Sequence, residues 1–211
     1  MISSCEYRKK SFEEYFKLLS QKSPCPGGGS ASLCALALAN ALLCMVANYS
    51  IDSSRVSPDH RRQLRTILDN AHSLGEKILD AVEKDSELFI AIQNSSRKAK
   101  KDPLCQSLFH DALKNSILFH LTALAWGIKI ITWNHTLLTQ GNPNLASDAR
   151  VSASLASGSF QGLKTLIHVN LEEIPDDDPF HIRFLTITNH LSDLFLQRDA
   201  FFQEMKEKNR R

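Results

Sequence analysis

The sequence predicts an all-α protein: a single-domain, up-and-down bundle of long helices that covers residues 1–211. Two observations predict this fold. Breaks rich in proline and glycine are few, and the long segments between them carry apolar residues at helical spacing. No segment reads clearly as a strand, because the one alternating stretch, residues 166–171, ends a helical pattern. Neither an internal repeat nor a linker divides the chain, so we expect one domain.

Caps and breaks along the chain place the individual helices. Ser11 can cap the first helix, Ser30 the second and Ser147 the fifth, because a serine oxygen accepts a hydrogen bond from a first-turn N–H group. Ser57 is followed by a proline and an acid, the expected start of a third helix. The expected helices span, in order, residues 11–21, 30–48, 57–93, 102–138, 147–169 and 180–208.

Composition and charge exclude several classes of protein. The formal net charge of +2 is small and the basic residues are scattered, so no nucleic-acid partner is predicted. The five cysteines form no CxxC pair, and their odd number favours free thiols in a reducing compartment over a disulfide framework. The N-terminal residues lack the apolar core of a signal peptide. We therefore expect a cytoplasmic protein.

Residues 31–49 carry no charged side chain, and the segment is long enough to be weighed as a membrane span. Asn40, Asn48 and many alanines, without a flanking basic cluster, favour instead a helix buried in a bundle or an oligomer. Residues 152–159 are similarly small. Because small-residue helices can approach closely, we expect them at the bundle centre or in the seam of a homodimer, with no membrane partner.

The third helix carries a carboxylate where its apolar stripe predicts an apolar residue. Asp85 lies three residues after Val82 and four before Phe89, which both belong to the stripe. A buried carboxylate must be paired or must hold a proton, and such a group suits general acid–base catalysis. The alternative is that the helix rolls slightly and leaves Asp85 in solvent beside Lys84.

Two polar stretches border the apolar helices. Gly27, Gly28 and Gly29 precede Ser30 at the mouth of the charge-free segment, where bare backbone can approach a ligand. They are no phosphate loop, because the Gly-Lys-Ser/Thr ending and a preceding strand are missing.

The second stretch is the loop before the fifth helix. Asn142, Asn144 and Asp148 form a compact hydrogen-bonding set that suits a polar heterocycle. Asp148 is equally well explained as a first-turn acid of that helix. The eight histidines, among them His110 and His120, show no metal-ligand spacing. We interpret them as structural or surface residues and expect no metal site.

Three stretches in combination resemble the formiminotetrahydrofolate cyclodeaminase / methenyltetrahydrofolate cyclohydrolase family. That family has a PGGGS turn before an alanine-rich helix ending in M-V-A-N, a D-x-E-x-F segment, and a G-N-P-N-x-x-S-D loop. The matching stretches here are PCPGGGSASLCALALANALLCMVANYS, DAVEKDSELFIAI and GNPNLASDARVSASLASGSFQGLKTLIHVNL. Their order and spacing agree over nearly the whole chain.

The resemblance implies an all-helical homodimer that binds a reduced folate, with or without a polyglutamate tail. It implies ring closure of 5-formiminotetrahydrofolate with loss of ammonia, or hydrolysis of the 5,10-methenyl form. Neither reaction requires a metal or a cofactor beyond the tetrahydrofolate itself. The family's catalytic aspartate falls on Asp85. Asn142, Asn144 and Asp148 would then hold the pterin or orient the reacting nitrogen, and Gly27–Ser30 would form one wall of the pocket through backbone N–H groups.

Two stretches depart from the family pattern. YSIDSSRVS (residues 49–57) lacks the family's G-K-K-x-Y-like segment, and Arg55 is the basic residue nearest to the missing lysines. NSILFHLTALAW (residues 115–126) stands where the family tends to have V-P-L-E-x-A. These departures leave three alternatives open beside the deaminase: a cyclohydrolase, a catalytically inactive folate-binding homologue, and an adaptor bundle without a ligand.

Overall fold

Two of the predicted caps begin helices in the computed structural model, which describes residues 6–208. Ser11 caps α1 (Phe12–Leu19) with a capping box, in which its side chain accepts from the N–H of Glu14 and the Glu14 carboxylate accepts from the N–H of Ser11. Ser57 caps α3 (Pro58–Ala99) by accepting a hydrogen bond of 3.2 Å from the N–H of His60. Both helix starts therefore follow from local side-chain chemistry.

The other two predicted caps are wrong. α2 (Gly28–Ile51) begins two residues earlier than expected, with Gly27 at its N-cap, and Ser30 is buried inside its first turn. The Ser30 hydroxyl bonds the Tyr15 hydroxyl at 2.8 Å, so it is committed to a tertiary contact. α5 (Ala146–Leu171) begins before Ser147, whose hydroxyl bonds the neighbouring Asp148 carboxylate at 3.4 Å.

The remaining elements agree with the predicted order. α4 (Gln106–Gln140) and α6 (Pro179–Lys208) are long helices, and residues 166–171 are helical as expected. Short 3-10 helices precede α1, α4 and α5: η1 (Tyr7–Lys9), η2 (Pro103–Cys105) and η3 (Pro143–Leu145). No strand occurs within residues 6–208. The all-α prediction is confirmed.

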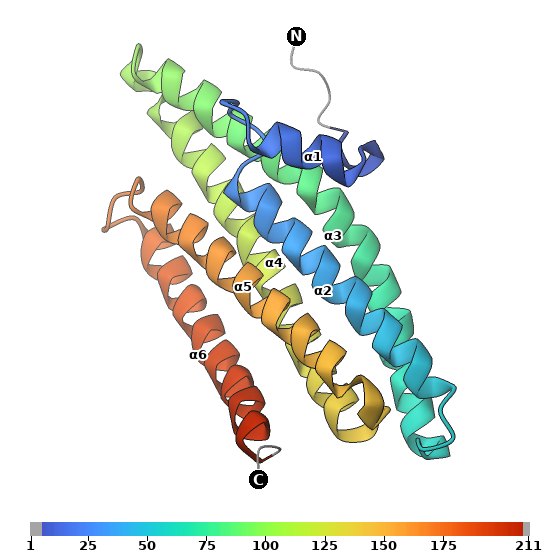
Figure 1. Ribbon diagram of the computed structural model, residues 1–211. Helices are drawn as coiled ribbons and strands as arrows, with labels where there is room; N and C mark the ends of the chain where they lie inside the picture. The colour runs from blue at the N-terminus through green and yellow to red at the C-terminus, as the bar shows by residue number, and fades with distance from the viewer. Residues whose placement is uncertain (1–5, 209–211) are drawn as a thin grey trace.

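The long helices form an up-and-down bundle (Figure 1). α2 packs against α3 and α5, α4 packs against the same two helices, and α6 lies against α4 and α5. In Figure 1, α1 crosses α3 near the start of α2. Helices α2, α3, α4 and α5 share one core. Its largest fully buried side chains are Leu33, Leu36, Leu43, Leu64, Ile78, Leu113, Ile117, Leu124, Ile130, Ile131, Phe160 and Leu163.

The alternating helix directions create two chemically different ends. α2 and α4 begin at one end, where α3 and α5 finish; we call it the glycine end, after Gly27–Gly29. The opposite end carries the turn between α4 and α5, residues 141–145, together with the first turn of α5, and we call it the loop end. The 24-residue α2 connects the two ends, and a helix of that length spans about 35 Å.

Two segments, α2 and Pro103–Gln140, are long and apolar enough to cross a membrane by length and composition alone. Half of the apolar window of each is buried inside the bundle. Because core helices of bundles share this composition, the two segments are weak indicators of a membrane protein.

Candidate functional site

A cavity of about 250 Å³ opens at the glycine end, between the start of α2 and the adjoining parts of α3, α4 and α5. It combines backbone-only walls, apolar side chains and a small polar group, which is the usual make-up of a small-molecule site. Its lining residues are Pro24, Cys25, Gly27, Gly28, Gly29, Asp85, Phe89, Ile92, Ser116, His120, Leu166, Val169 and Asn170.

Asp85 is buried on this cavity, and its exposed fraction of 9% rules out the alternative of a solvated side chain beside Lys84. Its carboxylate lies against the first turn of α2. A Cβ added to Gly29 would stand 2.5 Å from both Cγ and Oδ2 of Asp85, and closer still to Oδ1. Only glycine permits this approach. The free N–H groups and positive dipole of the α2 N-terminus favour a negative carboxylate there.

His120, on α4, is the hydrogen-bond partner of the Asp85 carboxylate. Its Nε2 lies 2.9 Å from Oδ1 of Asp85, and the imidazole is almost fully buried. On the other side of the ring, Nδ1 lies 3.5 Å from the Ser116 hydroxyl, and that hydroxyl accepts a bond of 3.1 Å from the Asn170 amide. Within residues 6–208, Oδ2 of Asp85 accepts no hydrogen bond, so one carboxylate oxygen remains available to a ligand.

Sequence reasoning missed His120. We interpreted the histidines as structural or surface residues, but this one is buried against the predicted catalytic carboxylate. The sequence does contain a signal for His120. Ser116 and His120 are polar residues four apart on either side of Ile-Leu-Phe, and they interrupt an apolar segment as Asp85 interrupts the apolar stripe of α3. His110 fits the interpretation better, since its ring bonds the Gln106 side chain on the same helix.

Ser30 and the predicted loop residues lie outside this cavity. The Ser30 side chain points to Tyr15, away from the lining. Asn142 donates its N–H to the Ser50 hydroxyl at 2.9 Å, and Asn144 accepts a bond of 3.0 Å from Arg55. Ser50 lies at the far end of α2 from Gly29, and a helix rises about 1.5 Å per residue. Within one chain, Asn142, Asn144 and Asp148 are therefore about 30 Å from Asp85. The single pocket expected from the sequence is therefore not formed within one chain.

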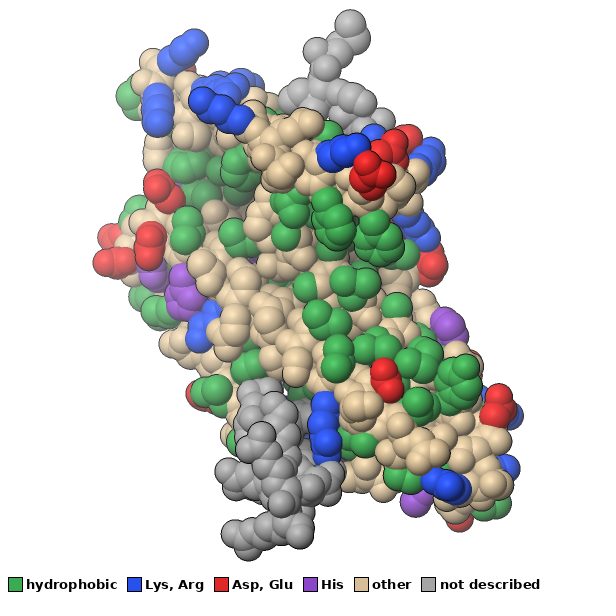
Figure 2. All heavy atoms as spheres, viewed as in Figure 1, with side chains coloured by type: hydrophobic (Ala, Val, Ile, Leu, Met, Phe, Trp, Pro, Cys, Tyr) green, Lys and Arg blue, Asp and Glu red, His purple; other side chains and the backbone are tan. Residues whose placement is uncertain are grey.

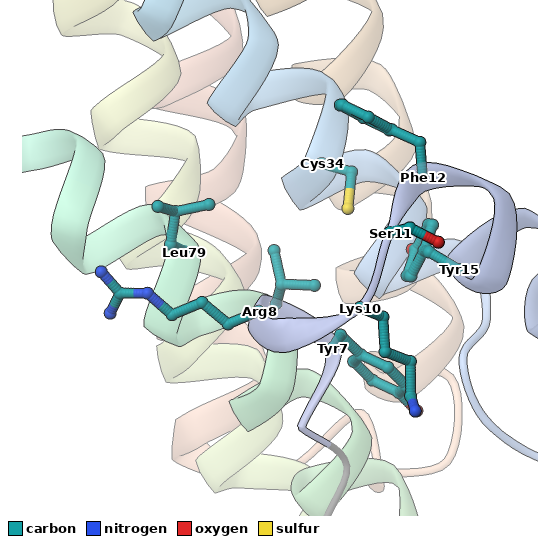
Figure 3. Close-up of a pocket in the computed structure, with 9 residues that line it drawn as sticks. Tyr7, Arg8, Lys10, Ser11, Phe12, Tyr15, Cys34 and Leu79 are labelled. Atoms are coloured by element: carbon teal, nitrogen blue, oxygen red, sulfur yellow. The ribbon is translucent and has the colours of Figure 1, made fainter.

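A second cavity of about 250 Å³ lies where η1 and α1 pack on α2 and α3 (Figure 3). Tyr7, Tyr15, Cys34 and Leu79 line it, together with the basic side chains of Arg8 and Lys10 in the same segment. Burial raises the pKa of the Tyr15 hydroxyl, which therefore stays neutral. None of the predicted site residues lines this cavity.

Within the described residues, no three histidine, cysteine, aspartate or glutamate side chains come together as a metal-ligand set. The polar side chains of the glycine-end cavity include one carboxylate and one imidazole, which suit proton transfer and hydrogen bonding.

Fold and site together define an all-helical protein with a buried aspartate–histidine pair beside a glycine-walled cavity. The family model described as formiminotransferase-cyclodeaminase matches residues 11–181, and the chain belongs to this family. The chain is 21% identical to the methenyltetrahydrofolate cyclohydrolase of Methylorubrum extorquens, over 94% of this chain and 97% of that protein.

The fold also matches a solved structure. The crystal structure of formiminotetrahydrofolate cyclodeaminase from Thermotoga maritima superposes with a TM-score of 0.87 at 26% sequence identity. The match covers 96% of this chain and 98% of that one. The family resemblance recognised in the sequence is confirmed.

Proposed function

We propose that this protein is an enzyme of folate one-carbon metabolism that converts 5-formiminotetrahydrofolate into 5,10-methenyltetrahydrofolate and ammonia, with Asp85 as the acid–base group. The observation that carries the proposal is the Asp85 carboxylate: it is buried on a cavity, held at Oδ1 by His120, and free at Oδ2. Family membership supplies the substrate class.

The proposed reaction requires one group that takes and returns a proton. N10 of the folate attacks the formimino carbon and forms the new C–N10 bond, and its proton passes to Asp85. Asp85 then protonates the formimino nitrogen, the bond from carbon to that nitrogen breaks, and ammonia leaves. The substrate enters with its formimino group protonated and therefore carries one positive charge. The methenyl product keeps this charge and ammonia leaves neutral, so atoms and charge balance. A carboxylate with one free oxygen can perform both transfers.

The cavity suits the flat part of a folate. Phe89, Ile92, Leu166 and Val169 offer apolar walls, and the first turn of α2 offers bare backbone. Because a folate exceeds 250 Å³, its aminobenzoyl-glutamate portion would extend out of the cavity along the protein surface. No metal and no cofactor beyond the tetrahydrofolate is included in this proposal, and the predicted cytoplasmic location remains a prediction.

A second candidate is methenyltetrahydrofolate cyclohydrolase at the same site. It is supported by the cyclohydrolase relative, which aligns with nearly the whole chain. In that reaction, water adds to the methenyl carbon and loses a proton to Asp85. The bond from that carbon to N5 then breaks as N5 takes the proton, and the hydroxyl proton leaves to solvent, so that the formyl product and one proton result. The same carboxylate therefore serves both reactions.

Turnover of the two folates by the purified wild-type protein tests the proposal. With 5-formiminotetrahydrofolate, we expect the absorbance of the methenyl product to rise and ammonia to appear in equal amount. With methenyltetrahydrofolate, loss of that absorbance would identify the cyclohydrolase. A folded protein that turns over neither substrate would contradict the enzyme proposal and favour the folate-binding homologue.

We further propose that the protein is a homodimer through the outer face of α2. Residues 31–51 carry no charge, yet this helix exposes Leu38 by 47% and Tyr49 by 63%. Figure 2 shows hydrophobic side chains gathered over α1 and α2, and Phe12 and Phe16 of α1 are exposed beside them. An uncharged face can pair with its own copy without like-charge repulsion, as a two-fold interface requires.

A two-fold axis perpendicular to α2 would also complete the candidate site. It makes the two α2 helices antiparallel, so the loop end of one copy lies against the glycine end of the other. Asn142, Asn144 and Asp148 of one copy would then approach the Asp85 cavity of the second. This arrangement accounts for the separation of the predicted site residues within one chain.

Leu38→Lys is expected to convert the dimer into a monomer, because it places two charges in an apolar interface. Sedimentation equilibrium measures the mass, and folate turnover should fall with the dimer fraction. Leu118→Lys on α4 is the matched control: Leu118 is 45% exposed, close to the exposure of Leu38, but lies outside the proposed interface. A wild-type monomer with full turnover would contradict both the dimer and the shared site.

A further inference from the structure

The strongest polar arrangement outside the proposed acid–base step is the buried chain behind Asp85. We propose that His120 is a positioning residue for the reaction: a fixed N–H donor that holds Oδ1 of Asp85 so that Oδ2 faces the substrate. The effect of His120 on turnover rests on the proposed function. The hydrogen bonds around His120 are contacts within the described residues and do not depend on it.

The hydrogen-bond partners of the two ring nitrogens of His120 determine which nitrogen carries the proton. An ionised carboxylate only accepts hydrogen bonds, so Nε2 of His120 must donate to Asp85. In a neutral imidazole, Nδ1 is then an acceptor. The Ser116 hydroxyl can satisfy it, because its oxygen already accepts from the Asn170 amide and its proton is free to donate. All donors in the chain Asn170–Ser116–His120–Asp85 therefore point toward the carboxylate.

The surroundings restrict the pair to this geometry. Asp85, Ser116 and His120 are all buried, and their hydrogen bonds join α3 to α4 and, through Asn170, to α5. On the opposite side, Gly29 leaves no room for the carboxylate to move toward α2. Asp85 is thus held between an imidazole donor and a glycine backbone. Such rigid placement of a reacting group is a large part of enzymatic rate enhancement.

The stretch that supplies His120 is one of the two that depart from the family pattern. Residues 115–126 replace the V-P-L-E-x-A-like sequence, and both His120 and Ser116 lie within them. This stretch therefore supplies both the imidazole that bonds Asp85 and the hydroxyl behind it.

Two substitutions of His120 separate positioning from packing. His120→Gln retains an N–H donor near the position of Nε2, whereas His120→Leu has similar bulk and no donor. We expect His120→Leu to lower kcat about 100-fold, the cost of an ångström-scale misplacement, with KM changed less than about threefold. His120→Gln should recover at least about tenfold of that loss, because the bond to Oδ1 is restored. His110→Leu, on the same helix and outside the cavity, should leave kcat unchanged.

A double variant tests whether His120 acts through Asp85. In an Asp85→Asn background, His120→Leu should lower kcat no further, since the group that it positions is already gone. Equal loss from the glutamine and leucine substitutions, full activity of His120→Leu, or additive loss in the double variant would each overturn the proposal.

One measurement on the free protein needs no turnover. Nitrogen-15 NMR of histidine-labelled wild type, with the His120 signal assigned by its absence in His120→Gln, should show a ring that carries a proton at Nε2. Ser116→Ala should shift the Nδ1 signal. A ring protonated at Nδ1 alone would overturn the donor chain. If wild type turns over neither folate, the proposed function fails while this spectrum still decides the arrangement around Asp85.

Discussion

Asp85→Asn is expected to lower kcat by about 100- to 10,000-fold with either folate, the range for loss of a general acid–base group. The amide cannot take and return the proton that moves between N10 and the leaving nitrogen. The protein should still fold, because the asparagine oxygen can accept the bond from His120 and the side chain keeps its size. KM should change little, since binding depends mostly on the cavity walls.

Steady-state turnover of 5-formiminotetrahydrofolate, followed by methenyl absorbance, measures this effect. Asp69→Asn is the matched control: it makes the same chemical change on the same helix, at an exposed position away from the cavity. Turnover undiminished in Asp85→Asn would remove Asp85 from the acid–base step while leaving the family membership intact. Equal losses in both aspartate variants would point to a general charge effect on the helix.

Gly29→Ala is the second large effect that we expect. The added methyl group overlaps the Asp85 carboxylate, since it would lie 2.5 Å from Cγ. Because His120 lies against the other side of the Asp85 carboxylate, the carboxylate cannot move away from the methyl group, and it must rotate or α2 must shift. We expect kcat to fall about 100-fold through misplacement of Asp85. The free energy of unfolding should fall by about 1–3 kcal/mol, as in other overpacked cores.

Gly28→Ala provides a control for the stability effect. A Cβ at Gly28 meets no atom within 4 Å, and Gly28 has no positive φ. We expect urea denaturation to show an unchanged free energy of unfolding, or a gain of up to about 1 kcal/mol from the smaller entropy of the unfolded chain. If Gly29→Ala were as stable and as active as wild type, the close approach of α2 to Asp85 would be wrong.

A double variant identifies the atom responsible for the overlap. Asp85→Ala removes the carboxylate and leaves space for the methyl group at position 29. The stability loss of Gly29→Ala should therefore be smaller in the Asp85→Ala background than in wild type, a coupling that neighbouring residues commonly show. Equal losses in the two backgrounds would assign the clash to another neighbour.

Local sequence chemistry was sufficient to predict the helices and to show that Asp85 interrupts an apolar stripe, but it left open whether the carboxylate is buried. Ser11 and Ser57 act through bonds to residues three positions away, so their caps are visible in the sequence. The stripe on α3 repeats every three to four residues, and a helix converts that spacing directly into one buried face. Ser30 and Ser147 misled the prediction because a cap depends on backbone direction, which tertiary contacts such as Tyr15–Ser30 decide.

The arrangement of the site depended on packing between helices. Asp85 and His120 lie 35 positions apart in sequence, on different helices, and the roll of each helix decides whether their side chains meet. The same holds for Gly29, whose contact with Asp85 joins the start of α2 to the second half of α3. Family-like motifs indicated that Asn142, Asn144 and Asp148 belong with Asp85, but alternating helix directions place them at the opposite end of one chain. Periodicity is a property of one helix, so the sequence alone shows it. The contact between a carboxylate, an imidazole and a glycine forms only when several helices pack, so only the tertiary structure decides it.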